Sequence, residues 1–208
     1  MTTAKIKICG IKDIDILQKI VELNIDYVGF IFFNKSPRNV DENFLRILNN
    51  FTFKETRPVC VYVNPDEDFV YKTSSYFTDP ILQFHGHENS SFCESFGLEY
   101  WKAIRVKTKE DLNAMDNFNS ASAILLENHK DGLYGGTGES FNWEILKEID
   151  TDKQNLILSG GINSQNVDNA LTTNSWCIDI NSGVESEAGK KDINLIINIL
   201  DKINNHDL

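Results

Sequence analysis

Short segments with alternating polar and apolar residues carry side chains that could perform acid-base chemistry, and Lys5–Cys9 is the first of them. In Lys5–Cys9, period-two alternation places Lys5, Lys7 and Cys9 on one face and two isoleucines on the other. Cys9 ends the segment, and Lys7 precedes it on the same face, where an ammonium group could lower the pKa of the thiol. A buried cysteine is also common as a small apolar residue, so position alone leaves both interpretations open.

Two further polar residues, Asp179 and His85, are expected on the faces of their strands that point into the protein, and each has more than one interpretation. The segment Cys177–Asn181 places Asp179 on its inward face. An inward carboxylate is costly unless it is paired or used, so Asp179 either pairs with an inward lysine or binds substrate hydroxyls. In Ile81–His85, the pattern places His85 inward, where a lone histidine is more often a hydrogen-bonded core residue than a catalyst.

Glycine-containing turns carry the clearest sign of a bound anion. Gly160 and Gly161 follow one strand-like segment, and Ser182 and Gly183 follow the next. Backbone N–H groups at such turns can approach an anion without basic side chains, and (β/α)8 barrels bind phosphate after their last two strands. Their joint placement therefore predicts a phosphate site. A third glycine run, Gly135–Gly138, is weak support for any site by itself.

The elements that would position these residues recur along the whole chain. Eight short apolar segments predict strands at Lys5–Cys9, Tyr27–Phe33, Val59–Val63, Ile81–His85, Tyr100–Val106, Ala123–Glu127, Asn155–Ser159 and Cys177–Asn181. Helical periodicity marks Asp13–Leu23, Glu42–Leu48, Glu67–Phe77, Ser91–Phe96, Lys109–Met115, Trp143–Ile149, Asn166–Leu171 and Ile193–Ile203. We therefore expect an α/β protein with a single (β/α)8 TIM-barrel domain over residues 1–208, and an open doubly wound sheet is the alternative.

Composition limits the classes of partner. The 208 residues are 41% hydrophobic, and a net charge of −11 disfavours nucleic acid and anionic membranes as partners. The longest apolar stretch is too short to span a bilayer and the N-terminus lacks a secretory pattern, so we expect a cytoplasmic protein. No metal-ligand spacing is present, so we expect no metal. The cysteines lack disulfide-scaffold spacing, so free thiols are expected at Cys9, Cys60, Cys93 and Cys177.

From Lys5 to Asp192, ordered motifs resemble those of the phosphoribosylanthranilate isomerase family. The motifs are KIKICGIKD (Lys5–Asp13), VGFIFFNKSPRNV (Val28–Val40), VYVN (Val61–Asn64), LQFHG (Leu82–Gly86), ILLE (Ile124–Glu127), YGGTGESFNW (Tyr134–Trp143), LSGGINSQNV (Leu158–Val167) and IDINSGVESEAGKKD (Ile178–Asp192). So many barrel-rim motifs in one order are far more specific than any single glycine loop.

The resemblance implies an Amadori-type rearrangement in tryptophan biosynthesis, from N-(5'-phosphoribosyl)anthranilate to 1-(2-carboxyphenylamino)-1-deoxyribulose 5-phosphate. A carboxylic acid protonates the ribose ring oxygen, the ring opens to a Schiff base, and a cysteine thiolate removes the C2′ proton. The family uses no metal and no cofactor. On this basis Cys9 is expected to be the general base, and Arg38 is expected to position a substrate anion.

One position departs from the family pattern. The family has aspartate where this chain has Glu127, and the extra methylene moves the carboxyl group by about 1.5 Å. We expect Glu127 to be the general acid, with Asp131 as the alternative. The resemblance also implies a set of substrate contacts, with phosphate as the main target of the glycines: His85, Gly160, Gly161, Asp179, Ser182 and Gly183.

The partner implied by these motifs is a small-molecule phosphosugar substrate, and the protein is expected to be a monomer or a homodimer. Indole-glycerol-phosphate synthase shares the terminal phosphate loops, but it has a longer N-terminal segment, for which a first strand beginning at Lys5 leaves no room. Further alternatives are an isomerase of a related aminoaldose phosphate and a barrel that binds a phosphorylated metabolite without catalysis.

Overall fold

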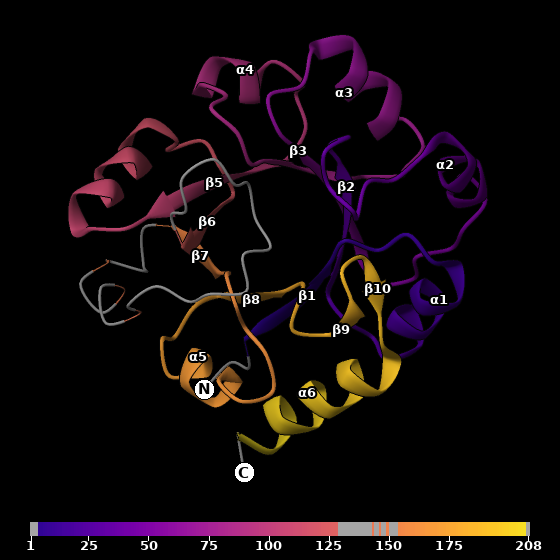
Figure 1. The fold of residues 1–208 in the computed structure, drawn as a ribbon. Coiled ribbons are helices and arrows are strands. Elements are labelled where there is room, and N and C mark those ends of the chain that lie inside the picture. The colour runs from indigo at the N-terminus through magenta and orange to yellow at the C-terminus, as the bar shows by residue number, and fades with distance from the viewer. Residues whose placement is uncertain (1–3, 129–142, 144–145, 147–148, 150–153, 207–208) are drawn as a thin grey trace.

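Eight parallel strands close into a barrel in sequence order (Figure 1). The computed structural model describes residues 4–128, 143, 146, 149 and 154–206. The barrel strands are β1 (Lys5–Cys9), β2 (Tyr27–Phe32), β3 (Arg57–Tyr62), β4 (Ile81–Phe84), β5 (Tyr100–Val106), β6 (Ala123–Asn128), β7 (Asn155–Leu158) and β8 (Cys177–Ile180). The prediction of a (β/α)8 TIM barrel is confirmed, and the predicted strand ends lie within two residues of the observed ones.

Helices surround the barrel in Figure 1. They are α1 (Ile14–Glu22), α2 (Glu42–Leu48), α3 (Glu67–Ser74), α4 (Ser90–Glu94), α5 (Val167–Leu171) and α6 (Ile193–His206). Four of them begin where an Asp or Asn side chain accepts first-turn N–H groups, at Asp13, Asp41, Asp66 and Asn89. Within the described ranges, no helix combines the length and apolar character needed to cross a bilayer.

Three segments differ from the expected elements. The helix expected at Lys109–Met115 is the 3-10 helix η1 (Lys109–Asn117). The helix expected at Trp143–Ile149 lies mostly outside the described residues. After β8, the short strands β9 (Glu185–Glu187) and β10 (Lys190–Lys191) form an antiparallel hairpin that the apolar pattern did not predict, because its residues are mostly polar.

Alternation along the strands separates two apolar layers. Ile6 and Ile8 of β1 pack in the layer between strands and helices, whereas Cys9 packs inside the barrel. Lys7, which lies between Ile6 and Ile8 in the sequence, is fully buried. The predicted inward face of β1 is therefore confirmed, as are the free thiols of the four cysteines.

Aromatic side chains fill the N-terminal end of the barrel interior. The ring centroid of Trp101 lies 4.9 Å from that of Tyr27 and 6.0 Å from that of Trp176, in edge-to-face contacts. Tyr27 begins β2, and Trp101 follows the first residue of β5. Both residues therefore lie at the opposite end of the barrel from Cys9 and Glu127, which are near the C-terminal ends of their strands. The end with open space is consequently the C-terminal end.

Candidate active site

A cavity enclosing about 650 Å³, part of it open to solvent, lies at the C-terminal ends of the barrel strands. It brings together residues that are widely separated in sequence and that were predicted as site residues: Cys9, Arg38, His85, Glu127, Gly160, Gly161, Asp179 and Ser182. Other lining residues, which the sequence analysis did not select, include Gln83, Ser159 and Asn181.

Gly183, also predicted as a substrate contact, is not among the residues that line the cavity. It forms a bridge with Asn163, and a Cβ atom at this position would collide with the carbonyl oxygen of Ile162. Only glycine permits this close approach. Gly183 therefore holds the turn after β8 against the turn after β7.

Lys7 links Cys9 to Asp179 inside the barrel. Its Nζ lies 3.1 Å from Oδ1 of Asp179, so the inward carboxylate is paired as one interpretation of the sequence expected. Burial alone lowers the pKa of Lys7, but the paired carboxylate of Asp179 raises it, and the pKa is above its usual value. Lys7 is therefore an ammonium ion.

The pKa of Cys9 has two opposing influences. Burial, the largest, raises the pKa of the thiol, whereas the charge of Lys7 lowers it. The pKa is raised overall. Lys7 thus acts in the predicted direction, but burial outweighs it, and Cys9 is a thiol at neutral pH.

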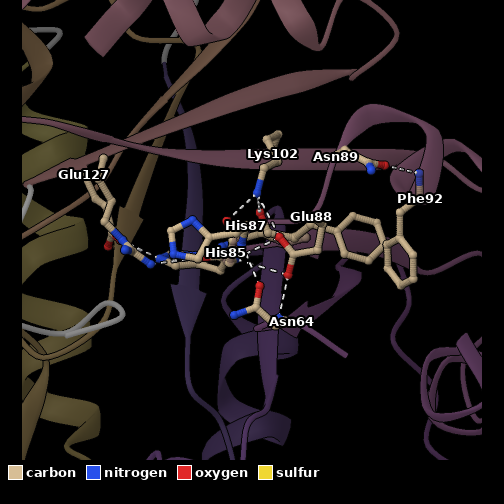
Figure 2. Close-up of polar contacts among 12 residues, drawn as sticks. Asn64, His85, His87, Glu88, Asn89, Phe92, Lys102 and Glu127 are labelled. Carbon is tan, nitrogen blue, oxygen red and sulfur yellow. Dashed lines mark hydrogen bonds and ion pairs between the residues drawn. The ribbon is translucent and has the colours of Figure 1, made fainter. Parts of the chain in front are cut away.

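The side chain of His85 lies next to that of Glu127 (Figure 2), and both residues line the cavity. Its Nε2 is 2.8 Å from Oε1 of Glu127, and its Nδ1 is 2.9 Å from Nε2 of Gln83. Both ring nitrogens are therefore occupied by the protein. Burial raises the pKa of Glu127, but His85 and then Arg105 lower it, and the pKa is below its usual value.

Arg38 is held by a charged cluster on the β9–β10 hairpin. Its Nε and Nη2 donate to the two carboxylate oxygens of Glu185 at 2.8 and 2.7 Å. Lys191 donates to Glu185 at 2.6 Å and to the side chain of Asn181 at 2.7 Å. Burial lowers the pKa of Lys191. This fork-to-carboxylate pairing orients the guanidinium beside the cavity.

The two glycines after β7, Gly160 and Gly161, line the cavity. Gly160 has φ +96° and Gly161 has φ +68°, a conformation that glycine adopts without strain. The carbonyl of Gly161 accepts hydrogen bonds from the side chains of Asn163 and Asn166, both at 3.0 Å. The peptide is thereby anchored on its carbonyl side. Within the described part of the chain, the N–H groups of Gly160, Gly161 and Ser182 donate no hydrogen bond, so they remain available to an anion.

A buried ion pair holds the turn that follows His85 (Figure 2). Lys102 donates to Glu88 at 2.9 Å and to the carbonyl of Gly86 at 2.8 Å. Glu88 in turn accepts the backbone N–H of Asn64 at 2.7 Å. Sequence reasoning missed this pair, although a lysine among the apolar residues of β5 was a usable signal.

Two predicted features fall outside the described residues: Asp131, the alternative acid, and the run Gly135–Gly138. Among the residues with described positions, no three His, Cys, Asp or Glu side chains are grouped to hold a metal ion.

A closed (β/α)8 barrel with acid-base residues and anchored glycine turns at its C-terminal rim is the arrangement of a barrel enzyme with its site at that rim. Residues 6–202 match the family model of N-(5'-phosphoribosyl)anthranilate (PRA) isomerase. The chain belongs to this family.

Individual relatives agree with this assignment. N-(5'-phosphoribosyl)anthranilate isomerase of Legionella pneumophila (strain Paris) is 38% identical over 190 residues, which cover 90% of this chain and 91% of the relative. The crystal structure of phosphoribosyl anthranilate isomerase from Thermotoga maritima is 28% identical, with a TM-score of 0.86 over 97% of this chain and 99% of that chain. Another solved structure is an isomerase in complex with reduced 1-(o-carboxyphenylamino)-1-deoxyribulose 5-phosphate, with 28% identity and a TM-score of 0.83 over the same shares.

Proposed function

We propose that this protein isomerises N-(5'-phosphoribosyl)anthranilate to 1-(2-carboxyphenylamino)-1-deoxyribulose 5-phosphate in tryptophan biosynthesis, with Cys9 as general base and Glu127 as general acid. The observation that carries the proposal is the meeting of Cys9, from β1, and Glu127, from β6, in one cavity. Family membership supports the reaction class, and the related isomerase complexed with the reduced ribulose phosphate supports the kind of ligand.

In the proposed reaction Glu127 gives a proton to the ribose ring oxygen as the C1′–O bond breaks. Cys9, as thiolate, then takes the C2′ proton from the resulting Schiff base, and the enolamine tautomerises to the ketone. The N–H groups of Gly160, Gly161 and Ser182 bind the phosphate, and Arg38 orients the substrate carboxylate. Asp179 and Ser159, joined at 3.3 Å, lie in the cavity where ribose hydroxyls would bind.

The resting protonation states make this reaction demanding. Chemistry needs a thiolate and a carboxylic acid, whereas the pKa of Cys9 is raised and the pKa of Glu127 is lowered. Free enzyme with both a Cys9 thiolate and a protonated Glu127 is therefore a minor population. Any contact that keeps the proton on Glu127 should raise the rate of turnover.

The test is turnover of freshly generated phosphoribosylanthranilate by the purified protein with a chelator present, followed by loss of anthranilate-type fluorescence. We expect turnover by the wild type, retention of it by Glu127→Asp, which restores the family residue, and loss of about 10²–10⁴-fold in kcat for Glu127→Gln. Asp131→Asn is the control and is expected to cost far less.

Other outcomes lead to other functions. A larger loss for Asp131→Asn than for Glu127→Gln would move the acid to residue 131. An absence of turnover, with phosphate analogues still bound, would favour a barrel that binds a phosphorylated metabolite without catalysis, or an isomerase of a related aminoaldose phosphate.

A further inference from the structure

A chain of buried hydrogen bonds runs through the barrel interior to Glu127. Nζ of Lys7 lies 2.9 Å from Oε1 of Gln83, and Nε2 of Gln83 lies 2.9 Å from Nδ1 of His85. His85 continues the chain through Nε2, 2.8 Å from Glu127. Each of these side chains is at most 9% exposed. The mechanism above uses only the last of the four residues as a proton donor.

The direction of every hydrogen bond in this chain follows from its first member. An ammonium group has only donors, so Oε1 of Gln83 must be the atom that accepts from Lys7. The amide nitrogen of Gln83 then faces His85 and donates to Nδ1. Because Nδ1 accepts, the ring proton of His85 is on Nε2, and Nε2 donates to Glu127.

We propose that Lys7 and Gln83 are positioning residues that lock His85 in its neutral Nε2–H form, so that a proton taken up by the His85–Glu127 pair resides on Glu127. This inference rests on the proposed function, in which Glu127 must carry a proton to the substrate.

The neutral form is favoured because each alternative arrangement places two hydrogen-bond donors against each other. A second proton on His85 would place Nδ1–H against the amide N–H of Gln83. Rotating the Gln83 amide would relieve that clash but would turn its NH2 group toward the Lys7 ammonium. Neither arrangement satisfies all of the buried donors, and an unsatisfied buried donor costs about 1–3 kcal/mol.

Charged groups around His85 act in both directions. Lys7 approaches from β1 and Arg105 from β5, where Nη2 donates to the carbonyl oxygen of His85 at 3.3 Å. Asp179 of β8 is paired with Lys7, and Glu127 of β6 is the anion in contact with the ring. The two cations oppose a positive charge on the His85 ring, whereas Glu127, in direct contact with it, favours one, so the donor conflict at Gln83 is what selects the neutral form.

A neutral His85 also changes the balance on Glu127. Burial raises the pKa of Glu127, and the charge of a protonated His85 is the largest influence that lowers it. Locking His85 in the neutral form removes that charge, while the hydrogen bond from His85 and the charge of Arg105 still lower the pKa of Glu127. The carboxyl group consequently holds its proton more strongly until the ribose ring oxygen takes it, and it recovers a proton from solvent after product release.

The direct test is ¹⁵N NMR of the His85 ring in the purified protein without substrate, with the resonances assigned by their loss in His85→Asn. At pH 7.5, and still at about pH 6, where an ordinary histidine is largely protonated, we expect Nδ1 unprotonated and Nε2 protonated. A protonated Nδ1 at pH 7.5 would overturn the lock. This readout needs no turnover, so its outcome is separate from that of the proposed reaction.

Two variants of Gln83 distinguish a lock from simple packing. The carboxylate introduced by Gln83→Glu can accept a hydrogen bond from Nδ1–H while still pairing with Lys7, so His85 should carry both ring protons at pH 7.5. Gln83→Met removes both polar groups at similar size, so Nδ1 should become protonated at about pH 6, unlike the wild type. Equal ¹⁵N titrations of wild type and both variants would contradict the proposal.

Turnover gives a second readout. In Gln83→Glu the cationic His85 should withdraw the proton from Glu127, and we expect kcat to fall about tenfold or more with KM little changed, because the substrate contacts remain. Gln83→Met should lose less at pH 8, where its His85 is again neutral. A larger loss in Gln83→Met than in Gln83→Glu at this pH would show that Gln83 acts through packing.

Discussion

The two ends of the barrel interior are built from the same eight strands but have opposite chemistry. At the N-terminal end, Tyr27, Trp101 and Trp176 pack edge to face and fill the space. At the C-terminal end, Cys9 and Glu127 line a cavity together with charged and polar neighbours. The N-terminal end buries apolar side chains. The C-terminal end buries ionisable groups, whose pKa values are shifted by burial and by neighbouring charges.

This difference separates stability from activity along single strands. β1 places Lys5 at the aromatic end and Cys9, four residues further along the chain, at the cavity. The filled end contributes hydrophobic free energy, whereas burial at the cavity end raises the pKa of Cys9 and requires Lys7 to be paired with Asp179. Substitutions at the N-terminal end should therefore lower stability, and substitutions at the C-terminal end should lower activity.

The largest effect is expected for Cys9→Ala. Loss of the proposed general base should lower kcat by about 10³–10⁴-fold while the thermal unfolding transition is retained. Cys177→Ala makes the same chemical change inside the barrel at the start of β8 and is the matched control, for which we expect nearly normal kcat. Steady-state kinetics of both variants would decide the point, and near-normal turnover of Cys9→Ala would exclude Cys9 as the base.

At the other end, Trp101→Ala should reduce the free energy of unfolding by about 3–5 kcal/mol, because a fully buried indole leaves a cavity. The folded fraction should keep its kcat/KM. Tyr71→Ala, which removes an aromatic ring that is 52% exposed, is the control and should cost about 1 kcal/mol or less. Denaturant titration measures both, and a loss of kcat without a loss of stability in Trp101→Ala would contradict the division of roles.

A smaller effect is expected for Arg38→Lys. Lysine cannot reproduce the two parallel hydrogen bonds to Glu185, so the cation loses its orientation, and KM should rise about tenfold. Arg46→Lys, on the exposed face of α2, should leave KM unchanged. If KM were unaffected in Arg38→Lys, the proposed contact with the substrate carboxylate would be wrong.

The smallest effect concerns pH. The pKa of Glu127 is lowered and that of Cys9 is raised, so between the two values each pH step gains thiolate as fast as it loses carboxylic acid. We therefore expect kcat/KM to be nearly flat from about pH 7 to pH 8.5, above the substrate phosphate ionisation near 6, and to fall above the pKa of Cys9. A steady tenfold rise per pH unit over this range would show that the acid stays protonated throughout, which would contradict a lowered pKa for Glu127 as the acid.

Much of the fold was predictable because its signals are local. Period-two alternation within five or six residues placed Lys7 and Cys9 inward, and the predicted strand ends lie within two residues of the observed ones. The hairpin Glu185–Lys191 was missed because it is stabilised by ion pairs with Arg38 and across its own strands, and not by an apolar pattern.

The sequence by itself determined the residue types at the C-terminal rim and their order along the chain, including Glu127, where the family resemblance implies aspartate. Only the tertiary structure decided which of these residues meet: Lys7 with Gln83, and His85 with Glu127. Those contacts depend on strand register and barrel closure, which join residues tens of positions apart. Proton affinity depends on the same contacts, because burial and neighbouring charge exist only once the barrel has closed.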